Sequence, residues 1–204
     1  MRKKYLSFKF HITFPLESFK EYAHYIEESL RKEVRVYEDM ANDLDEEEKE
    51  AFWDHYIDEV SKYYQEFPQI MRNSLFVSIY TFLEDKLIEL CVPNDETTLK
   101  LSDINGKGIQ QASIYLKKVL RINFPDHSKE WHFIKNSNLI RNCIVHNNGD
   151  ISKSSNEKKL RNIIKDMSNV TIDNKDYIIL DNKFCDNFIN NVESFLSQLY
   201  GFKK

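Results

Sequence analysis

"IMRNSLFVSIYTFLEDKLIELC" (residues 70–91) is a strongly apolar stretch in the first half of the chain. Its apolar side chains recur every three or four positions, which is the spacing of one buried face of an α-helix. The positions with this spacing are Leu75, Ile79, Phe82, Leu83, Leu87 and Leu90. The pattern predicts a core helix over residues 68–91, with Pro68 interrupting or kinking the segment before it.

The composition fits a helical protein with one core. The chain has 204 residues, of which 41% are hydrophobic, and it holds only four Gly and four Pro. This length is enough for one ordinary domain, or for one domain with a small extension. So few turn-forming residues indicate long regular elements rather than a many-stranded sheet.

Helical spacing predicts further elements on both sides of the core helix. One helix is expected over residues 17–43, and Asp45 is a suitable cap for a second. Asp103 is expected to cap a helix over residues 104–122. Ser128 begins a helix that runs to about residue 147, where Asn-Asn-Gly ends it. A short helix over residues 156–167 and an amphipathic helix over residues 183–200 complete the set.

Two stretches favour β-structure. Apolar and polar residues alternate in "SFKFHITF" (residues 7–14), which predicts a half-buried strand that Pro15 ends. "VTIDNKDYIIL" (residues 170–180) predicts a hairpin that turns at residues 173–176. We therefore expect a mainly α fold, a helical bundle with a small antiparallel β element. That element is the N-terminal strand, the hairpin near residues 170–180, or both.

The sequence carries no indication of a membrane or metal protein. It has no run of 18 apolar residues, and its basic start lacks the unbroken apolar region of a signal peptide. The cysteines are too far apart for a metal-ligand spacing or a disulfide framework; they are Cys91, Cys143 and Cys185. A metal set around His55, with Asp54, Asp58 and Glu59, lacks further ligands, so a solvated helix face is the simpler interpretation. We expect a cytoplasmic protein with no metal, no cofactor and no membrane partner.

Charge is shared unevenly along the chain. Residues 1–100 contain 13 Lys/Arg and 22 Asp/Glu, a balance of −9, whereas residues 101–204 contain 16 and 11, a balance of +5. A basic second half is compatible with a polyanionic ligand there. A solvated charge pattern without any ligand explains the same numbers.

One helix of the basic half combines residues that can perform chemistry. It ends in "NLIRNCIVHNNGD" (residues 138–150), which holds Arg141, Asn142 and His146. Asn142 and His146 are four residues apart and share a helix face, but Arg141 and His146 lie roughly 140° apart around the axis. Two copies of the helix, packed across a twofold axis, would bring the Arg of one chain beside the His of the other.

Such a set has the groups needed to cleave RNA without a metal. A histidine can take the proton of the 2′-hydroxyl, and a guanidinium can stabilise the charge that builds up on the phosphate. Asn142 can orient either the imidazole or the phosphate, and a second His can protonate the departing 5′-oxygen. An Arg and a His with this spacing also occur often by chance as surface contacts.

The stretch "LIRNCIVHNNG" (residues 139–149) resembles the motif of HEPN domains, whose ribonuclease members carry Arg-x4–6-His with a polar residue after the Arg. The matching residues are Arg141, Asn142 and His146. "SLFVSIYTFLEDKLIELC" (residues 74–91) is similar to the second core helix of that family, and the hairpin and last helix resemble the end of several members. The resemblance covers about residues 74–199. It implies one HEPN-like helical domain over residues 1–204, with a core at 66–204 and a family-variable extension at 1–65.

The resemblance also implies an activity. HEPN ribonucleases are homodimers with the motif in a shared cleft, and they leave 2′,3′-cyclic phosphate and 5′-hydroxyl ends. Many serve as toxins or phage-defence effectors, some of them inhibited by a nucleotidyltransferase-type antitoxin. We therefore expect RNA as the substrate, a second copy of the chain as a partner and an antitoxin as a further partner. The alternative is a catalytically silent HEPN-like module that dimerises or binds nucleotides.

Overall fold

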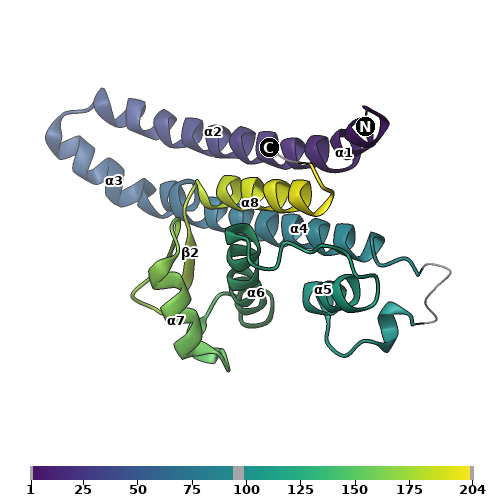
Figure 1. Ribbon diagram of the computed structural model, residues 1–204. Helices are drawn as coiled ribbons and strands as arrows, with labels where there is room; N and C mark the ends of the chain where they lie inside the picture. The colour runs from purple at the N-terminus through teal and green to yellow at the C-terminus, as the bar shows by residue number, and fades with distance from the viewer. Residues whose placement is uncertain (1, 94–98, 203–204) are drawn as a thin grey trace.

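The structure is a computed structural model and describes residues 2–93 and 99–202. It is mainly helical with one small β-hairpin, which confirms the expected fold class (Figure 1). The helices are α1 (Arg2–Phe8), α2 (Phe14–Asn42), α3 (Glu46–Ser61), α4 (Phe67–Glu89), α5 (Gly108–Lys118), α6 (Lys129–Asn147), α7 (Glu157–Asp166) and α8 (Phe184–Leu199). The loop predicted between α4 and α5 lies partly outside the described residues.

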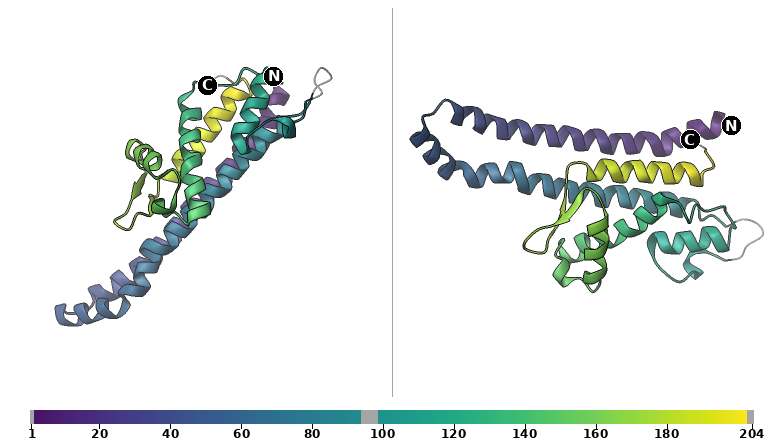
Figure 2. Two further views of the ribbon diagram at one scale, coloured as in Figure 1. Left: turned by 90° about the horizontal axis from the view of Figure 1, so that it is seen from below. Right: turned by 60° about the vertical axis from the view of Figure 1, so that its left-hand side comes forward.

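The helices form two layers around α4. Helices α2, α4 and α8 run side by side, while α5 and α6 pack on the side of α4 that faces away from α2 (Figure 1). Helix α3 continues into α4, so that α2 and the α3–α4 arm make one long helical hairpin whose tip projects beyond the remaining helices (Figure 2). No helix among the described residues is long and apolar enough to cross a bilayer.

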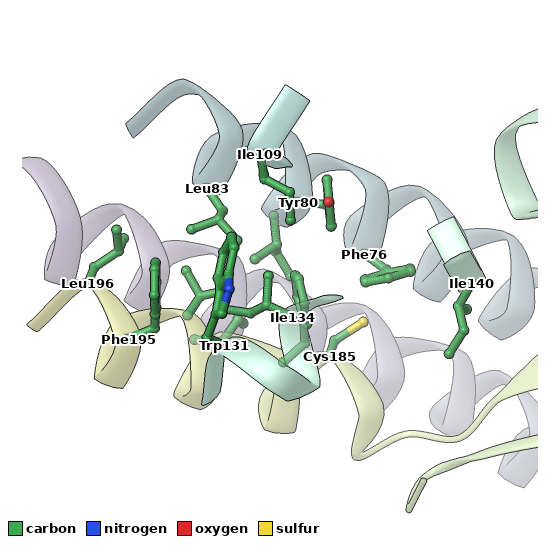
Figure 3. Close-up of a cluster of buried hydrophobic side chains, with 14 of the residues drawn as sticks. Phe76, Tyr80, Leu83, Ile109, Trp131, Ile134, Ile140, Cys185, Phe195 and Leu196 are labelled. Atoms are coloured by element: carbon green, nitrogen blue, oxygen red, sulfur yellow. The ribbon is translucent and has the colours of Figure 1, made fainter. Parts of the chain in front are cut away.

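The core is built on the predicted helix, α4. Its fully buried side chains include Leu83 and Leu87. Phe76 meets Phe188 of α8 edge to face at 4.9 Å, and Trp131 of α6 stacks on Phe195 of α8 at 5.0 Å (Figure 3). Aromatic contacts of this kind add to the free energy of burying the rings, so α4 and α6 are both fixed against α8.

The predicted N-terminal strand is wrong. Residues 2–42 are helical throughout, and Phe8 and Ile12 are buried while Phe10 and Phe14 are exposed. A strand would have placed these four side chains on one face. The alternation of apolar and polar residues over only eight positions is compatible with a helix as well as with a strand. The helical structure buries Phe8 against Tyr200 and Phe202 at the end of the chain, and the two strands of the hairpin pair with each other rather than with the N-terminus.

A π-helical turn accommodates each of two prolines, Pro15 and Pro68. The π-helical turns Lys9–Thr13 and Lys62–Glu66 each lead into Phe-Pro, so that "KFHITFP" and "KYYQEFP" share the pattern Lys-x4-Phe-Pro. A proline inside an α-helix lacks a donor and clashes with the carbonyl of the preceding turn. Widening that turn relieves the clash, since π-turns bond five residues apart. Pro68 therefore interrupts the α-helical pattern, as expected, while the arm continues through it.

The predicted helix ends are mostly confirmed. Asp45 caps α3 through a capping box with Glu48, and Ser128 caps α6 by accepting from the Trp131 amide. The hairpin is β1 (Val170–Ile172) and β2 (Ile178–Leu180), paired antiparallel as predicted. The expected cap Asp103 is wrong, because it bonds the amide of Lys100 in a 3₁₀ turn, and α5 begins only at Gly108.

The helical N-terminus makes a prediction that a strand would not make. Ile12→Ala should lower the free energy of unfolding by about 2–5 kcal/mol, since Ile12 is 1% exposed. Phe10→Ala should change it by less than about 0.5 kcal/mol, since Phe10 is 63% exposed. Urea denaturation followed by circular dichroism measures both. Similar losses for the two variants would favour the strand.

Candidate functional site

Helix α6 is held in place by its apolar face. Trp131, Ile134, Ile140 and Cys143 are buried against α4 and α8, while the opposite side of the helix carries His132, Lys135, Asn142 and His146. Asn148 adopts the left-handed conformation that closes the helix, and Gly149 follows it with φ of 79°. The end predicted from Asn-Asn-Gly is therefore confirmed, and it leaves His146 in the last turn.

Arg141 turns sideways from this outer face toward α4. Its Nη2 lies 3.5 Å from Oε2 of Glu84, and its guanidinium carbon lies 4.5 Å from the centre of the Tyr80 ring. The side chains of Arg141 and Glu84 are 22% and 28% exposed. The guanidinium is thus placed by an acid and by the face of an aromatic ring, a position that attracts cations.

Comparison with Arg72 shows how few of the Arg141 side-chain donors take part in hydrogen bonds. Arg72 donates from Nε and Nη2 to both oxygens of Glu27, at 2.6 and 2.9 Å, and from Nη1 to the carbonyl oxygen of Leu180. Arg141 makes one ion pair, which is longer than an ordinary hydrogen bond, and its buried Nε has no partner among the described residues. A guanidinium has five N–H donors, so the Nη donors of Arg141, apart from the one nearest Glu84, are left for a ligand.

The Tyr80 hydroxyl is also without a partner. Tyr80 is only 1% exposed, and no group among the described residues meets its hydroxyl at full hydrogen-bond geometry; the Arg141 guanidinium is the polar group nearest in effect. Burial raises the pKa of Tyr80 well above its ordinary value, and the positive charge of Arg141 beside it offsets only part of this effect. The hydroxyl therefore keeps its proton at neutral pH. Buried polar groups are rarely left unpaired, so two unpaired groups side by side, the Tyr80 hydroxyl and Arg141 Nε, make this an unusual site.

The carboxylate of Glu84 also lies against the start of α5. A Cβ at Gly108 would lie 2.9 Å from Oε1 of Glu84, and Gly108 has φ of 58°, so only glycine fits there without strain. The N-terminus of α5 is the positive end of its dipole and favours a carboxylate. Glu84 therefore lies between two positive groups, the α5 terminus and Arg141.

A single chain does not assemble the three motif residues into one site. Asn142 is half-buried and His146 is exposed, on the shared face that their spacing predicts. Over residues 2–93 and 99–202, no hydrogen bond or ion pair joins Arg141, Asn142 and His146 to one another. The structure brings Arg141 to α4 and leaves the other two facing outward.

Sequence reasoning missed Tyr80 and Glu84. The sequence does contain one signal for Glu84: it is an ionisable residue within a strongly apolar helix. Such a residue is costly to bury without a partner, so a partner is expected. That partner could not be named, since Arg141 lies far along the chain.

Charged residues of both signs follow the end of α6. Helix α7 packs against α6, and the hairpin follows it in the chain (Figure 1). Four lysines of this region form no ion pair within the described part of the chain; they are Lys158, Lys159, Lys165 and Lys175. Residues 148–181 hold six Lys/Arg and six Asp/Glu, so the region as a whole carries no net charge.

Other candidate residues stay apart. In the described residues no three His, Cys, Asp or Glu side chains meet in a way that could hold a metal ion, and the residues around His55 are no exception. Cys91, Cys143 and Cys185 are buried free thiols, and burial raises the pKa of each. No protein-family model, curated protein or solved structure matches this chain.

The unpaired hydroxyl predicts an unusual stability change. Tyr80→Phe should raise the free energy of unfolding by about 1 kcal/mol, because it removes a buried polar group that has no partner. Tyr115→Phe is the matched control: Tyr115 is equally buried, but its hydroxyl donates to the Leu99 carbonyl oxygen at 2.7 Å. That variant should lose about 1 kcal/mol. Thermal and urea denaturation of both proteins measure the two effects, and equal losses would assign the Tyr80 hydroxyl a hidden partner.

Proposed function

We propose that this protein is a metal-independent endoribonuclease that acts as a homodimer. The observation that carries the proposal is Arg141, a half-buried arginine placed by Glu84 and Tyr80 with most of its donors unused. It lies in the same motif as Asn142 and an exposed His146. The resemblance of this motif to that of HEPN ribonucleases supports the same activity.

The reaction needs only groups that the motif supplies. His146 takes the proton of a 2′-hydroxyl, and the 2′-oxygen attacks the adjacent phosphorus. The bond from phosphorus to the 5′-oxygen breaks, and His146 of the second chain returns a proton to that oxygen. Arg141 stabilises the charge on the non-bridging oxygens, and Asn142 orients imidazole or phosphate. The products are a 2′,3′-cyclic phosphate and a 5′-hydroxyl.

A dimer through α6 is the simplest way to complete this set. The outer side of α6 presents Val145, which is 48% exposed, together with the half-buried Leu139. Burying such apolar side chains between two copies favours association. A twofold axis near the end of α6 brings the Arg141 of one chain toward the His146 of the other.

The biological role follows from the activity. A nuclease that cuts cellular RNA harms its own cell, so we propose a toxin or phage-defence effector with an inhibiting partner of the nucleotidyltransferase-type antitoxin class. Growth inhibition on expression that disappears in His146→Ala supports this role. Inhibition that persists in that variant contradicts it.

One observation favours the second candidate, a catalytically silent module that dimerises or binds nucleotides. Glu84 lies near the Arg141 guanidinium and partly neutralises the charge that a phosphate would need. On this hypothesis Arg141 either lines a nucleotide-binding site or contacts the second chain in a dimer interface. Arg141→Ala would then weaken association of the chains, and no RNA would be cut by the parent protein.

The ribonuclease proposal predicts cleavage in EDTA. The wild-type protein should cut structured RNA with EDTA present, and His146→Ala should lower the rate by about 10²–10⁴-fold, the usual contribution of general acid–base catalysis. Arg141→Ala should lower it by about 10²–10³-fold. Gel analysis of end-labelled RNA, with detection of the cyclic phosphate, measures these rates.

A histidine far from the motif serves as the control. His55→Ala, on exposed α3, should cut like the parent. Cleavage by His146→Ala at the parent rate would remove the assignment of His146, and loss of cleavage in His55→Ala would indicate a different centre.

A composite site also predicts a dependence on concentration. The rate per chain should fall when the protein is diluted below the dissociation constant of its dimer, because a lone chain holds no complete site. Analytical ultracentrifugation gives that constant, and single-turnover cleavage over the same concentrations gives the rate. A constant rate per chain across the dissociation midpoint would contradict the shared site.

A further inference from the structure

A groove opens beside the end of the motif helix. It lies between the beginning of α4, with the π-helical turn before it, and the β-hairpin, and it has a volume of about 760 Å³. Small-molecule sites usually measure about 300–1,000 Å³, so a nucleotide fits. Six residues give the groove its chemistry: Tyr64, Gln69, Asn73, Asn148, Lys175 and Tyr177. We call it the hairpin groove.

Its floor presents a donor and an acceptor side by side. Gln69 Nε2 donates to the carbonyl oxygen of Ile178 at 3.4 Å and to Oδ1 of Asn73 at 3.0 Å. A carbonyl oxygen can only accept, which fixes the orientation of the Gln69 amide and therefore that of Asn73. Among the residues that the structure describes, Oε1 of Gln69 and Nδ2 of Asn73 have no hydrogen-bond partner. The edge of a nucleobase offers the complementary donor and acceptor pair.

Two tyrosines at the groove are suited to stacking. Tyr64 is 70% and Tyr177 is 36% exposed, and neither ring packs against another aromatic ring among the described residues. Most other tyrosines of the chain have such a partner or are buried. Exposed rings beside hydrogen-bonding amides are the usual platform for unstacked bases of single-stranded RNA.

The charges of the groove favour a base inside and the phosphate outside. Asp173 and Glu66 also line it, and Asp173 Oδ1 already accepts the backbone amides of Lys175 and Tyr177. These carboxylates disfavour a phosphate within the groove. The ammonium group of Lys175 lies on its wall and forms no ion pair in the described residues.

The groove reaches the residue that ends the motif helix. Asn148, the residue that ends α6, lines it, and Asn148 lies two residues after His146. Two residues span at most about 7 Å of chain. A nucleotide whose base occupies the groove can therefore present its phosphate close to His146.

We propose that the hairpin groove binds one unpaired base of the substrate RNA and so selects the position of the cut, an inference that rests on the proposed ribonuclease function. Gln69 and Asn73 read the edge of the base, and Tyr64 or Tyr177 stacks on its face. Lys175 attracts the adjoining phosphate. The enzyme accordingly cuts single-stranded segments next to one preferred base.

Binding tests the groove separately from catalysis. The probes are fluorescent hexamers of each of the four bases with 2′-O-methyl groups, which block attack by the 2′-oxygen, and fluorescence anisotropy measures their affinity. The parent should bind one hexamer at least about tenfold more tightly than the weakest. Tyr64→Ala should weaken all four by roughly five- to hundredfold. Tyr25→Ala is the matched control, since Tyr25 is 72% exposed on α2, and it should bind like the parent.

The edge-reading residues need two variants. Gln69→Ala with Asn73→Ala should reduce the preference among the hexamers to about twofold or less. Asn73→Asp replaces the donor by an acceptor of the same shape, so it should lose the preference even if the double variant fails to fold. Equal binding of the four hexamers by the parent, or an unchanged preference in Asn73→Asp, overturns the groove proposal.

Cleavage separates this proposal from the one on which it rests. EDTA-resistant cutting with the same base preference in parent and Asn73→Asp removes the groove and leaves the ribonuclease. Hexamer binding that depends on Tyr64 and Asn73, in a protein that cuts no RNA, removes the ribonuclease instead.

Discussion

Burial of α4 on several sides is the constraint on which the other elements depend. Helices α2, α8, α5 and α6 all pack against it. A polar group on the buried sides of such a helix cannot reach water, so it is costly there unless a neighbouring helix supplies a partner. Tyr80 and Glu84 are two such residues. Their position turns the side chain of Arg141 toward α4 and separates it from Asn142 and His146.

Local signals made much of this fold predictable, and one weak local signal misled. The caps at Asp45 and Ser128 and the end of α6 depend on residues within a few positions, so the sequence indicates them directly. The alternation of apolar and polar residues over 7–14 is also a local signal, but a stretch of eight residues is too short for it to distinguish a strand from a helix. The repeated Lys-x4-Phe-Pro pattern, which occurs at 9–15 and 62–68, would have identified the N-terminus as a helix carrying a π-turn.

The candidate site was predictable only in part, for a geometric reason. Arg141, Asn142 and His146 lie within one helix, where spacing fixes their directions. Glu84 and Tyr80 reach Arg141 from α4, Gly108 of α5 lies against Glu84, and the groove combines the start of α4 with the hairpin. Contacts between residues so far apart in the chain depend on helix packing. A single sequence contains no direct signal of which side chains will meet.

The contact with Glu84 is weak enough to position the Arg141 guanidinium without neutralising it. A partly exposed ion pair at 3.5 Å is weak, about 0–1 kcal/mol in typical proteins. A phosphate oxygen that approaches the unused donors of Arg141 makes shorter, charge-assisted hydrogen bonds, which are roughly twice as strong as neutral ones. Glu84 can therefore hold the guanidinium in place against Tyr80 without competing effectively with the substrate. Arg72, which already donates from all three of its side-chain nitrogens to Glu27 and Leu180, could not be recruited in this way. The incomplete pairing of Arg141 is what a phosphate-binding role requires.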